Sequence, residues 1–228
     1  MSKFDAEGEN ATFRRPARLG EEVYNTLYAQ LISNKIAPGG RIAVDNLVRE
    51  LGVSQTPIRE ALSRLEAQGL VVKTHLIGYS AAPQMDRARL DQLYELRLLL
   101  EPFAVGRAAL HVTDETITEL ERLAADMQGD SSDDPGLAYG RFARLDEAFH
   151  DLIAATSGNE LIHDVLERQH THVHLFRLFY HVRVTAEAID EHRRILDALR
   201  NRDAKAAETA MREHIERSRR RFGAAFKD

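Results

Sequence analysis

Residues 52–70, GVSQTPIREALSRLEAQGL, decide the fold of the first third of the chain. Ser54 is placed to cap a helix, Pro57 lies in its first turn, and Gly69 supplies a stop. Between these limits the apolar residues recur at helical spacing and predict one inward face. That face consists of Ile58, Ala61, Leu62 and Leu65.

A second face of this helix is polar. It carries Thr56, Arg59 and Ser63, with Gln55 at the exposed start. This is the geometry of a recognition helix, whose first residues reach base edges in the major groove. Arg59 could make a bidentate contact to guanine, and Gln55 could contact a base or a phosphate. Periodicity alone equally allows a small helical domain with an ordinary polar face.

The flanking segments complete a recognisable order of elements. Helical spacing over about 19–33 is followed by the break APGGRI and a short helix over about 45–51. After Gly69, the segment GLVVKTHLIGYSAAP predicts two short strands around a turn, with Gly78 near the bend. Helix, helix, recognition helix and wing make a winged helix-turn-helix. We assign residues 18–83 to this domain and residues 1–17 to a flexible tail.

The remainder, residues 84–228, shows only helical periodicity. About six long helices joined by short connections predict an all-α antiparallel bundle, so the chain is mainly α. The predicted breaks lie near 112, 130–136, 157–159, 182–185 and 201–203.

Composition limits the class of protein. The chain has 228 residues, no cysteine and a net charge of −5. Without cysteine there are no disulfides or thiolate metal sites, and no apolar run is long enough to span a bilayer. We therefore expect a cytoplasmic protein that does not contact the membrane. Residues 1–80 hold 10 Lys and Arg against 9 Asp and Glu, whereas the rest is acidic, which hints at two domains with different partners.

Two costly polar side chains lie on a helix face that ought to be buried. In LDEAFHDL, residues 145–152, Asp146 and His150 are one turn apart within an apolar stripe. A buried carboxylate without a partner costs several kcal/mol, so something must compensate it. A hydrogen bond between the two side chains would do so, and a metal ion would do it better.

Two further histidines lie on inward stripes. His192 precedes the predicted hairpin turn RNRDA by about 8 residues and His214 follows it by about 11, so their heights differ by only ~5 Å. With Asp146 and His150 they form a set of one carboxylate and three imidazoles. Such ligands suit a divalent metal, with Zn²⁺ the first expectation and Ni²⁺, Mn²⁺ or Fe²⁺ as alternatives.

The remaining inward polar residues admit two interpretations each. Arg97 shares a stripe with leucines, and its guanidinium could pair with Glu101 or clamp a ligand carboxylate. His172 lies near an inward stripe and could line a cavity. Asn159 is expected to cap a helix. Four other histidines are expected to face solvent or a subunit contact, away from Val165, Phe176 and Phe179: His163, His170, His174 and His181.

The first third resembles the DNA-binding domain of the GntR superfamily of bacterial transcription regulators. The resemblance rests on LISNKIAPGGRI, LVRELGVSQTPIREALSRLEAQGLV and the wing glycine, and covers about residues 19–82. It implies DNA contacts from Ser54, Gln55, Thr56 and Arg59, with Gly78 at the wing tip. The family usually has arginine where this chain has Gln55, so the base preference there is open. The preceding helix, VDNLVREL, is also atypical.

The rest resembles the FCD effector domain of the FadR subfamily, over about residues 86–225. The segments that carry this are LYELRLLLEPFAVGRAA, DEAFHDLIAATSGN, EHRRILDALRNRD and MREHI. The resemblance implies metal ligation by Asp146, His150, His192 and His214, and associates Arg97 with small carboxylates beside the metal.

These features predict a ligand-responsive transcription regulator, which we expect to be a repressor. It would act as a homodimer on a roughly palindromic operator, with a small carboxylate effector bound near the metal. One alternative is a regulator for which the ion itself is the signal. Another is a metal-dependent hydrolase, which we disfavour because no further general base accompanies the ligands.

Overall fold

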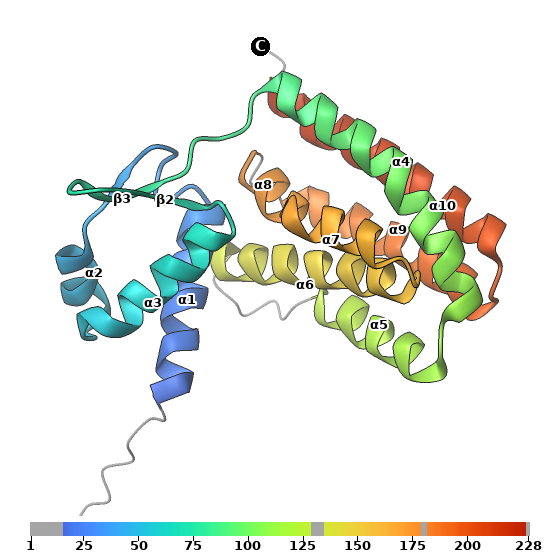
Figure 1. Ribbon diagram of the computed structural model, residues 1–228, viewed down its shortest axis with the longest axis horizontal. Helices are drawn as coiled ribbons and strands as arrows, with labels where there is room; N and C mark the ends of the chain where they lie inside the picture. The colour runs from blue at the N-terminus through green and yellow to red at the C-terminus, as the bar shows by residue number, and fades with distance from the viewer. Residues whose placement is uncertain (1–15, 129–134, 179–181, 227–228) are drawn as a thin grey trace, which may run out of the picture.

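The structure is a computed structural model that describes residues 16–128, 135–178 and 182–226 (Figure 1). A head of helices and a small sheet packs against the end of a helical bundle. The predicted mainly α architecture, winged helix-turn-helix plus bundle, is confirmed. Most of the predicted tail lies outside the described residues, and the first helix already begins at Pro16.

The head follows the predicted order with one addition. Helices α1 (Pro16–Ile32), α2 (Val44–Leu51) and α3 (Gln55–Ala67) pack beneath strands β2 (Val71–Thr74) and β3 (Gly78–Ala81). A further strand, β1 (Arg41–Ile42), pairs antiparallel with β3 and gives the order β1-β3-β2. This strand lies in the segment predicted as a break, because two residues are too few to show an alternating pattern.

The bundle contains seven helices among the described residues rather than about six. They are α4 (Arg87–His111), α5 (Asp114–Asp126), α6 (Pro135–Thr156), α7 (Glu160–Arg168), α8 (Thr171–Leu178), α9 (Val182–Arg200) and α10 (Ala204–Gly223), and a 3-10 turn, Ala224–Phe226, ends the described chain. The unpredicted break separates α7 from α8 at His170, whose φ is 42°. No glycine or proline marks it. Val165, which lies on the side away from the histidines expected to face solvent, is itself exposed.

Several helices begin at a residue whose side chain caps the first turn. Side chains of Asp86, Thr113, Asn159 and Asp203 each accept a hydrogen bond from the backbone N–H three residues on, as N-caps do. Asn159 therefore caps α7 as predicted. At the end of α3, Gly69 takes φ 69°, a conformation that costs glycine little.

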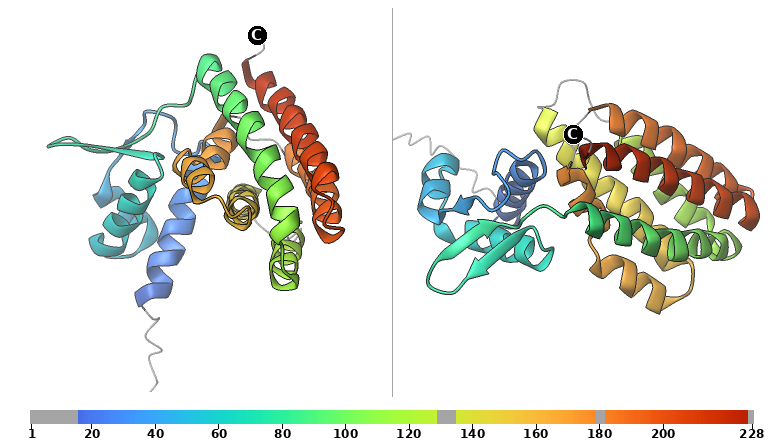
Figure 2. Two further views of the ribbon diagram at one scale, coloured as in Figure 1. Left: turned by 45° about the vertical axis from the view of Figure 1, so that its right-hand side comes forward. Right: turned by 90° about the horizontal axis from the view of Figure 1, so that it is seen from above.

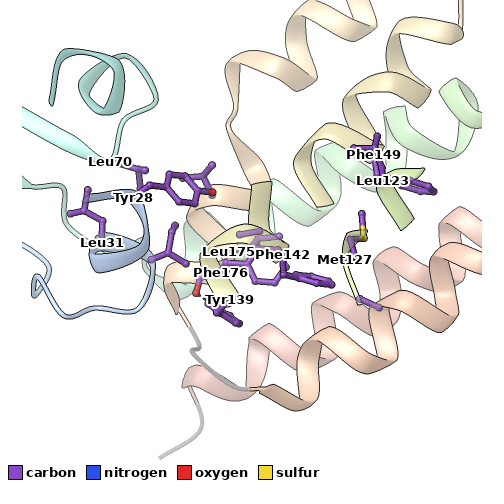
Figure 3. Packing of buried hydrophobic residues seen from close by; sticks show 14 of the residues in the cluster. Tyr28, Leu31, Leu70, Leu123, Met127, Tyr139, Phe142, Phe149, Leu175 and Phe176 are labelled. Atoms are coloured by element: carbon purple, nitrogen blue, oxygen red, sulfur yellow. Dashed lines mark hydrogen bonds between the residues drawn. The ribbon is translucent and has the colours of Figure 1, made fainter. Parts of the chain in front are cut away.

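Head and bundle share one continuous core. Tyr28 of α1 extends toward Phe142 of α6 and Phe176 of α8, and Leu31 and Phe149 belong to the same cluster (Figure 3). At Gly140 a Cβ would lie 3.2 Å from the Ala29 Cα, so the close approach of α1 to α6 depends on glycine there. Among the described helices, none has the length and hydropathy of a bilayer-spanning segment.

Candidate metal centre and DNA-reading surface

Three helices bring the four predicted metal ligands together. Asp146 and His150 come from α6, His192 from α9 and His214 from α10, and all four are at most 7% exposed. The ring centroids of the three histidines are 4.9–5.4 Å apart, and each can offer a nitrogen within 4.8 Å of the others. The Asp146 Oδ1 lies 3.2 Å from the His192 Nε2. The set therefore occupies one small volume inside the bundle.

Helix periodicity and one hairpin account for this convergence. One turn of α6 separates Asp146 from His150, so both point to the same side. The turn between α9 and α10 is closed by a hydrogen bond from the Asp203 N–H to the Ala198 carbonyl. The two helices then run antiparallel, which places His192 beside His214.

Two of the imidazoles are held by carboxylates through Nδ1. His150 Nδ1 lies 2.8 Å from the Glu101 Oε2, and His214 Nδ1 lies 2.8 Å from the Glu191 Oε2. Such a carboxylate fixes the ring and its tautomer and leaves Nε2 available to a metal. Neither pairing was predicted from the sequence, because the partners are 49 and 23 residues apart.

Several buried atoms at the centre have no hydrogen-bond partner. They are the Asp146 Oδ1, the His150 Nε2 and both ring nitrogens of His192; the Asp146 Oδ1 and the His192 Nε2 lie 3.2 Å apart but without the geometry of a hydrogen bond. An unpaired buried polar atom is costly, so native proteins seldom keep one without a ligand or water. A neutral imidazole has one nitrogen with a free lone pair, so Asp146, His150 and His192 each offer one buried lone-pair donor that no hydrogen bond uses. The residues present therefore fit a divalent metal ion.

Burial also sets the protonation that a metal needs. It lowers the pKa of His150, His192 and His214 below the ordinary value, so the rings are neutral at neutral pH. Burial opposes ionisation of Asp146, but the charge and hydrogen bond of His172 outweigh it and keep the pKa of the carboxyl low. Three neutral imidazoles and one carboxylate can bind a cation without first losing protons from positively charged rings.

His172 belongs to the centre more closely than its sequence position indicated. It is buried on α8, its Nδ1 lies 2.5 Å from the Asp146 Oδ2, and its ring centroid is 4.4 Å from that of His150. With Glu101 and His150 it forms a second group of close ligand atoms. The only sequence signal was a position near an inward stripe.

Arg97 is buried and fully engaged with Glu101. Its Nε and Nη2 donate to the two carboxylate oxygens at 2.5 and 3.2 Å, which raises the pKa of the guanidinium although burial opposes it. Glu101 in turn holds His150. The two interpretations of Arg97, an ion pair with Glu101 or a clamp for a ligand carboxylate, therefore involve the same connected side chains, Arg97, Glu101 and His150. The carboxylate clamp stays a prediction, and it requires Arg97 to be shared with or released by Glu101.

Two spaces adjoin the centre. A volume of about 10 Å³ lies between Arg97, Asp146 and His214, enough for about one water molecule. A larger cavity of about 270 Å³ is lined by His150, and by His172 and Arg144 as well. It extends to Gln68 at the end of α3. A small molecule thus fits near His150 rather than beside Arg97.

The other histidines lie near the head or the surface. His163 pairs with Asp151, and His170 lies 3.6 Å from Glu147; both are half-buried rather than fully exposed. His174 faces Gly69 of the head, and burial followed by the charge of Arg177 lowers its pKa to about 4. His181 and Phe179 lie outside the described residues.

The predicted DNA-reading residues share an exposed surface of the head. Ser54 sits at the N-cap of α3 but makes no capping hydrogen bond, and Thr56 is exposed. Arg59 Nη2 donates to the Gln55 Oε1 at 3.2 Å, and Gln55 Nε2 donates to the Asp45 Oδ1 at 2.9 Å. Gly78, with φ 109°, begins β3 just after the exposed turn of the wing.

Both parts of the chain match known families. Residues 19–78 match "Bacterial regulatory proteins, gntR family", and residues 92–217 match the FCD domain. An uncharacterised HTH-type transcriptional regulator in an unstable DNA locus of Streptomyces ambofaciens is 30% identical, over 85% of this chain and 80% of the relative. The HTH-type transcriptional repressor RspR of Escherichia coli is 27% identical, over 87% of this chain and 86% of its own.

Solved structures share the fold. McbR/YncC of E. coli superposes with a TM-score of 0.66 at 23% identity, covering 92% of this chain and 99% of that one. A GntR regulator from Rhodococcus sp. RHA1 gives 0.65 at 19% identity, covering 92% and 100%.

Proposed function

Because the chain belongs to the GntR family of bacterial regulatory proteins and carries an FCD domain, we propose a specific mode of action for it. The protein is a helix-turn-helix transcription regulator and not an enzyme. In our proposal it is a homodimeric repressor whose bundle holds a divalent metal and binds a small organic acid. The observation that carries this is the set of unpaired buried donors on Asp146, His150 and His192.

Asp146, His150, His192 and His214 are the residues that would hold the metal. Nitrogen and oxygen donors favour Zn²⁺, with Ni²⁺, Mn²⁺ and Fe²⁺ also compatible. A bound ion supplies positive charge and open coordination positions for an anionic ligand. The chain itself supplies orientation, because Glu101 and Glu191 fix the rings of His150 and His214.

The proposed effector space is the 270 Å³ cavity beside His150. Its size suits a small molecule, and Arg144 is a cation in its wall. Arg97 would act on a ligand by way of Glu101 and His150, or directly if Glu101 moves. In either case the ligand would also reach Gln68 of the head.

Helix α8 supports coupling between this space and the head. Toward the centre, its His172 holds Asp146. Toward the recognition helix, its His174 lies against Gly69. One helix of eight residues thus touches both a predicted metal ligand and the end of α3.

The same helix also holds the linker between the domains. Arg177 is fully buried, and its Nη2 donates to the Ala82 carbonyl at 2.6 Å. The Arg177 carbonyl accepts from Asn34 at 2.9 Å and from Gln84 at 2.6 Å. A displacement of α8 would therefore move α3, the first loop and the linker together. Coupling of this kind typically amounts to ~1–3 kcal/mol, or a several-fold change in operator affinity.

One observation favours the metal ion as the signal instead. Arg97 is already satisfied by Glu101, and the space beside it holds about one water. In that case metal binding alone would reorient Asp146, and with it His172.

Selection from a random DNA pool tests the proposal. Metal-loaded protein should enrich an inverted repeat with half-sites about one helical turn apart, and Arg59→Ala should fail to enrich it. Operator affinity is then measured against zinc alone and against zinc with a panel of small carboxylic acids. A response only to an acid supports the effector model, and a response to zinc alone supports the metal sensor. Failure to enrich any sequence would refute the DNA-reading assignment.

A further inference from the structure

The wall of the 270 Å³ cavity is acidic for a site that is to receive an acid. The charged side chains that line it within the described residues are Glu101, Glu147, Asp151, Glu167 and Arg144. His150, which is 7% exposed and whose Nε2 has no hydrogen-bond partner, also lines the space. A simple carboxylic acid in this cavity would face more negative than positive charge from the wall. The wall therefore restricts which acids can bind there.

One face of α6 supplies much of this charge. Arg144, Glu147 and Asp151 recur at intervals of three and four residues, so they lie on one side of the helix. Glu167 of α7 and His170, in the turn from α7 to α8, complete this part of the wall. Seen from above, that turn lies at the end of the bundle nearest the head (Figure 2). The outer part of the cavity is therefore bounded by α6 and the turn between α7 and α8.

The carboxylates of the wall differ in how well they are neutralised. Glu101 receives two hydrogen bonds from Arg97. The Glu147 side chain is only 27% exposed, and it lies 3.6 Å from the His170 Nδ1, too far for a hydrogen bond. A half-buried carboxylate of this kind can accept hydrogen bonds from a ligand in the cavity.

The guanidinium of the wall is engaged by the head. Arg144 Nη1 donates to the Asn25 Oδ1 of α1, and its guanidinium lies 5.4 Å from the centre of the Tyr28 ring. Within the described residues, no ion pair joins Arg144 to Glu147. The charge of Glu147 is therefore left for a ligand to compensate.

The outer carboxylates are not arranged as a metal site. Among the described residues, the ligand atoms of three side chains come within 4.8 Å of one another in two groups, both at the centre. Neither group includes Glu147, Asp151 or Glu167. A hard cation such as Ca²⁺ needs about six to eight close oxygen ligands, so an organic cation suits these carboxylates better.

We propose that the effector is a small zwitterion, an amino acid or a close chemical relative, whose ammonium group is bound by Glu147. An ammonium group brings three N–H donors and one positive charge, which compensates the half-buried carboxylate. The inference rests on the proposed function, which places an acid group of the ligand near the metal. It goes further in naming a second charged group on the ligand and the residue that binds it.

Isothermal titration calorimetry of the zinc-loaded full chain tests the ligand class. The probes are matched pairs that differ only in an ammonium or a hydroxyl group: alanine and lactate, aspartate and malate, β-alanine and 3-hydroxypropanoate, 4-aminobutanoate and 4-hydroxybutanoate. At least one amino acid should bind ~10-fold more tightly than its hydroxy acid, because a hydrogen bond between charged groups is stronger than one to a neutral hydroxyl. Hydroxy acids that bind as tightly as their amino acids would overturn the inference.

A substitution at Glu147 tests the residue. Glu147→Gln keeps the size of the side chain but removes its charge, so it should weaken binding of the preferred amino acid by ~10-fold and leave the matched hydroxy acid unchanged. Glu216→Gln, at an exposed residue of α10, is the matched control and should change neither affinity. An unchanged amino-acid affinity in Glu147→Gln would overturn the role of Glu147. The comparison of ligands in the wild-type chain tests the ligand class even if this variant does not fold.

Amines without an acid group separate this inference from the proposed function. Ethylamine and propylamine carry the ammonium group alone and should bind more weakly than the amino acids. If they bind as tightly, the ammonium site stands and the organic-acid effector of the proposed function fails. If simple carboxylic acids bind and amino acids do not, the proposed function stands and this inference fails. Binding by none of the acids, amino acids or amines overturns both.

Discussion

The proposed metal centre can be tested most sharply by substituting Glu191, which supports a proposed ligand but is not itself assigned as one. Glu191 accepts the Nδ1 proton of His214 at 2.8 Å, so it should fix the ring with Nε2 directed inward. We expect Glu191→Gln to weaken metal affinity by about 10- to 100-fold, the usual effect of losing such a carboxylate. That corresponds to ~1.4–2.7 kcal/mol.

The effect should appear in the stabilisation that metal confers. At saturating free zinc, metal adds RT ln(1 + [L]/Kd) to the free energy of unfolding, so the same ~1.4–2.7 kcal/mol is lost. For a chain of this size ~1 kcal/mol shifts Tm by about 2–4 °C. The rise in Tm on adding zinc should therefore shrink by about 3–11 °C. Thermal melts at buffered free zinc, with a chelator competition titration, measure both quantities.

A control is needed because Glu191 also binds Arg221. The guanidinium donates to both carboxylate oxygens, at 2.6 and 2.8 Å. Arg221→Gln removes this ion pair but leaves Glu191 beside His214. It should lower the Tm of the metal-free protein and keep the zinc-induced rise. If the two variants lower Tm equally and neither changes the zinc-induced rise, Glu191 is only structural and does not support metal binding by His214.

Three further predictions follow from other parts of the chain. Arg59→Ala should weaken operator binding by ~1–3 kcal/mol, measured by fluorescence anisotropy, and should leave Tm unchanged. The control Arg64→Ala, which removes a surface ion pair with Glu21, should bind the operator with wild-type affinity. Arg177→Gln should leave zinc affinity unchanged but reduce the effect of metal or ligand on operator affinity; an unchanged effect would exclude α8 as the coupling element. The free energy of unfolding of the metal-free protein, measured with urea, should fall as pH falls from about 6.5 toward 4. The reason is that burial lowers the pKa of His174 to about 4 and lowers the pKa of His192 as well. Over this pH range the unfolded chain binds more protons than the folded one. A free energy of unfolding that does not change with pH would therefore contradict the conclusion that these histidines are buried and neutral.

The convergence of the four proposed metal ligands could be predicted because helix periodicity determines which residues share a face. Asp146 and His150 are fixed relative to each other by one helical turn, and a short hairpin fixes His192 relative to His214. The carboxylates behind them could not be predicted, since contacts such as Glu101 with His150 depend on how separate helices pack.

The break at His170 was also invisible in the sequence, and it has the largest consequence for function. Without glycine or proline, nothing in the pattern separated α7 from α8, so His172 was placed on a long helix with uncertain direction. The turn redirects the chain so that α8 inserts between the centre and the head. A change of direction set by tertiary packing leaves no local signature.

The charges inside the bundle give an independent reason to expect an anionic ligand once metal is bound. Arg97 neutralises Glu101 and Arg221 neutralises Glu191, each through two hydrogen bonds. Asp146 is the remaining buried carboxylate of the centre. Burial keeps the imidazoles of His150 and His192 beside it neutral, whereas the charge and hydrogen bond of His172 stabilise the carboxylate. Asp146, His150 and His192 together therefore carry about one negative charge without metal, and a divalent ion adds two positive charges. Since buried charges are compensated in stable proteins, the metal-loaded centre should favour one carboxylate from the adjoining cavity.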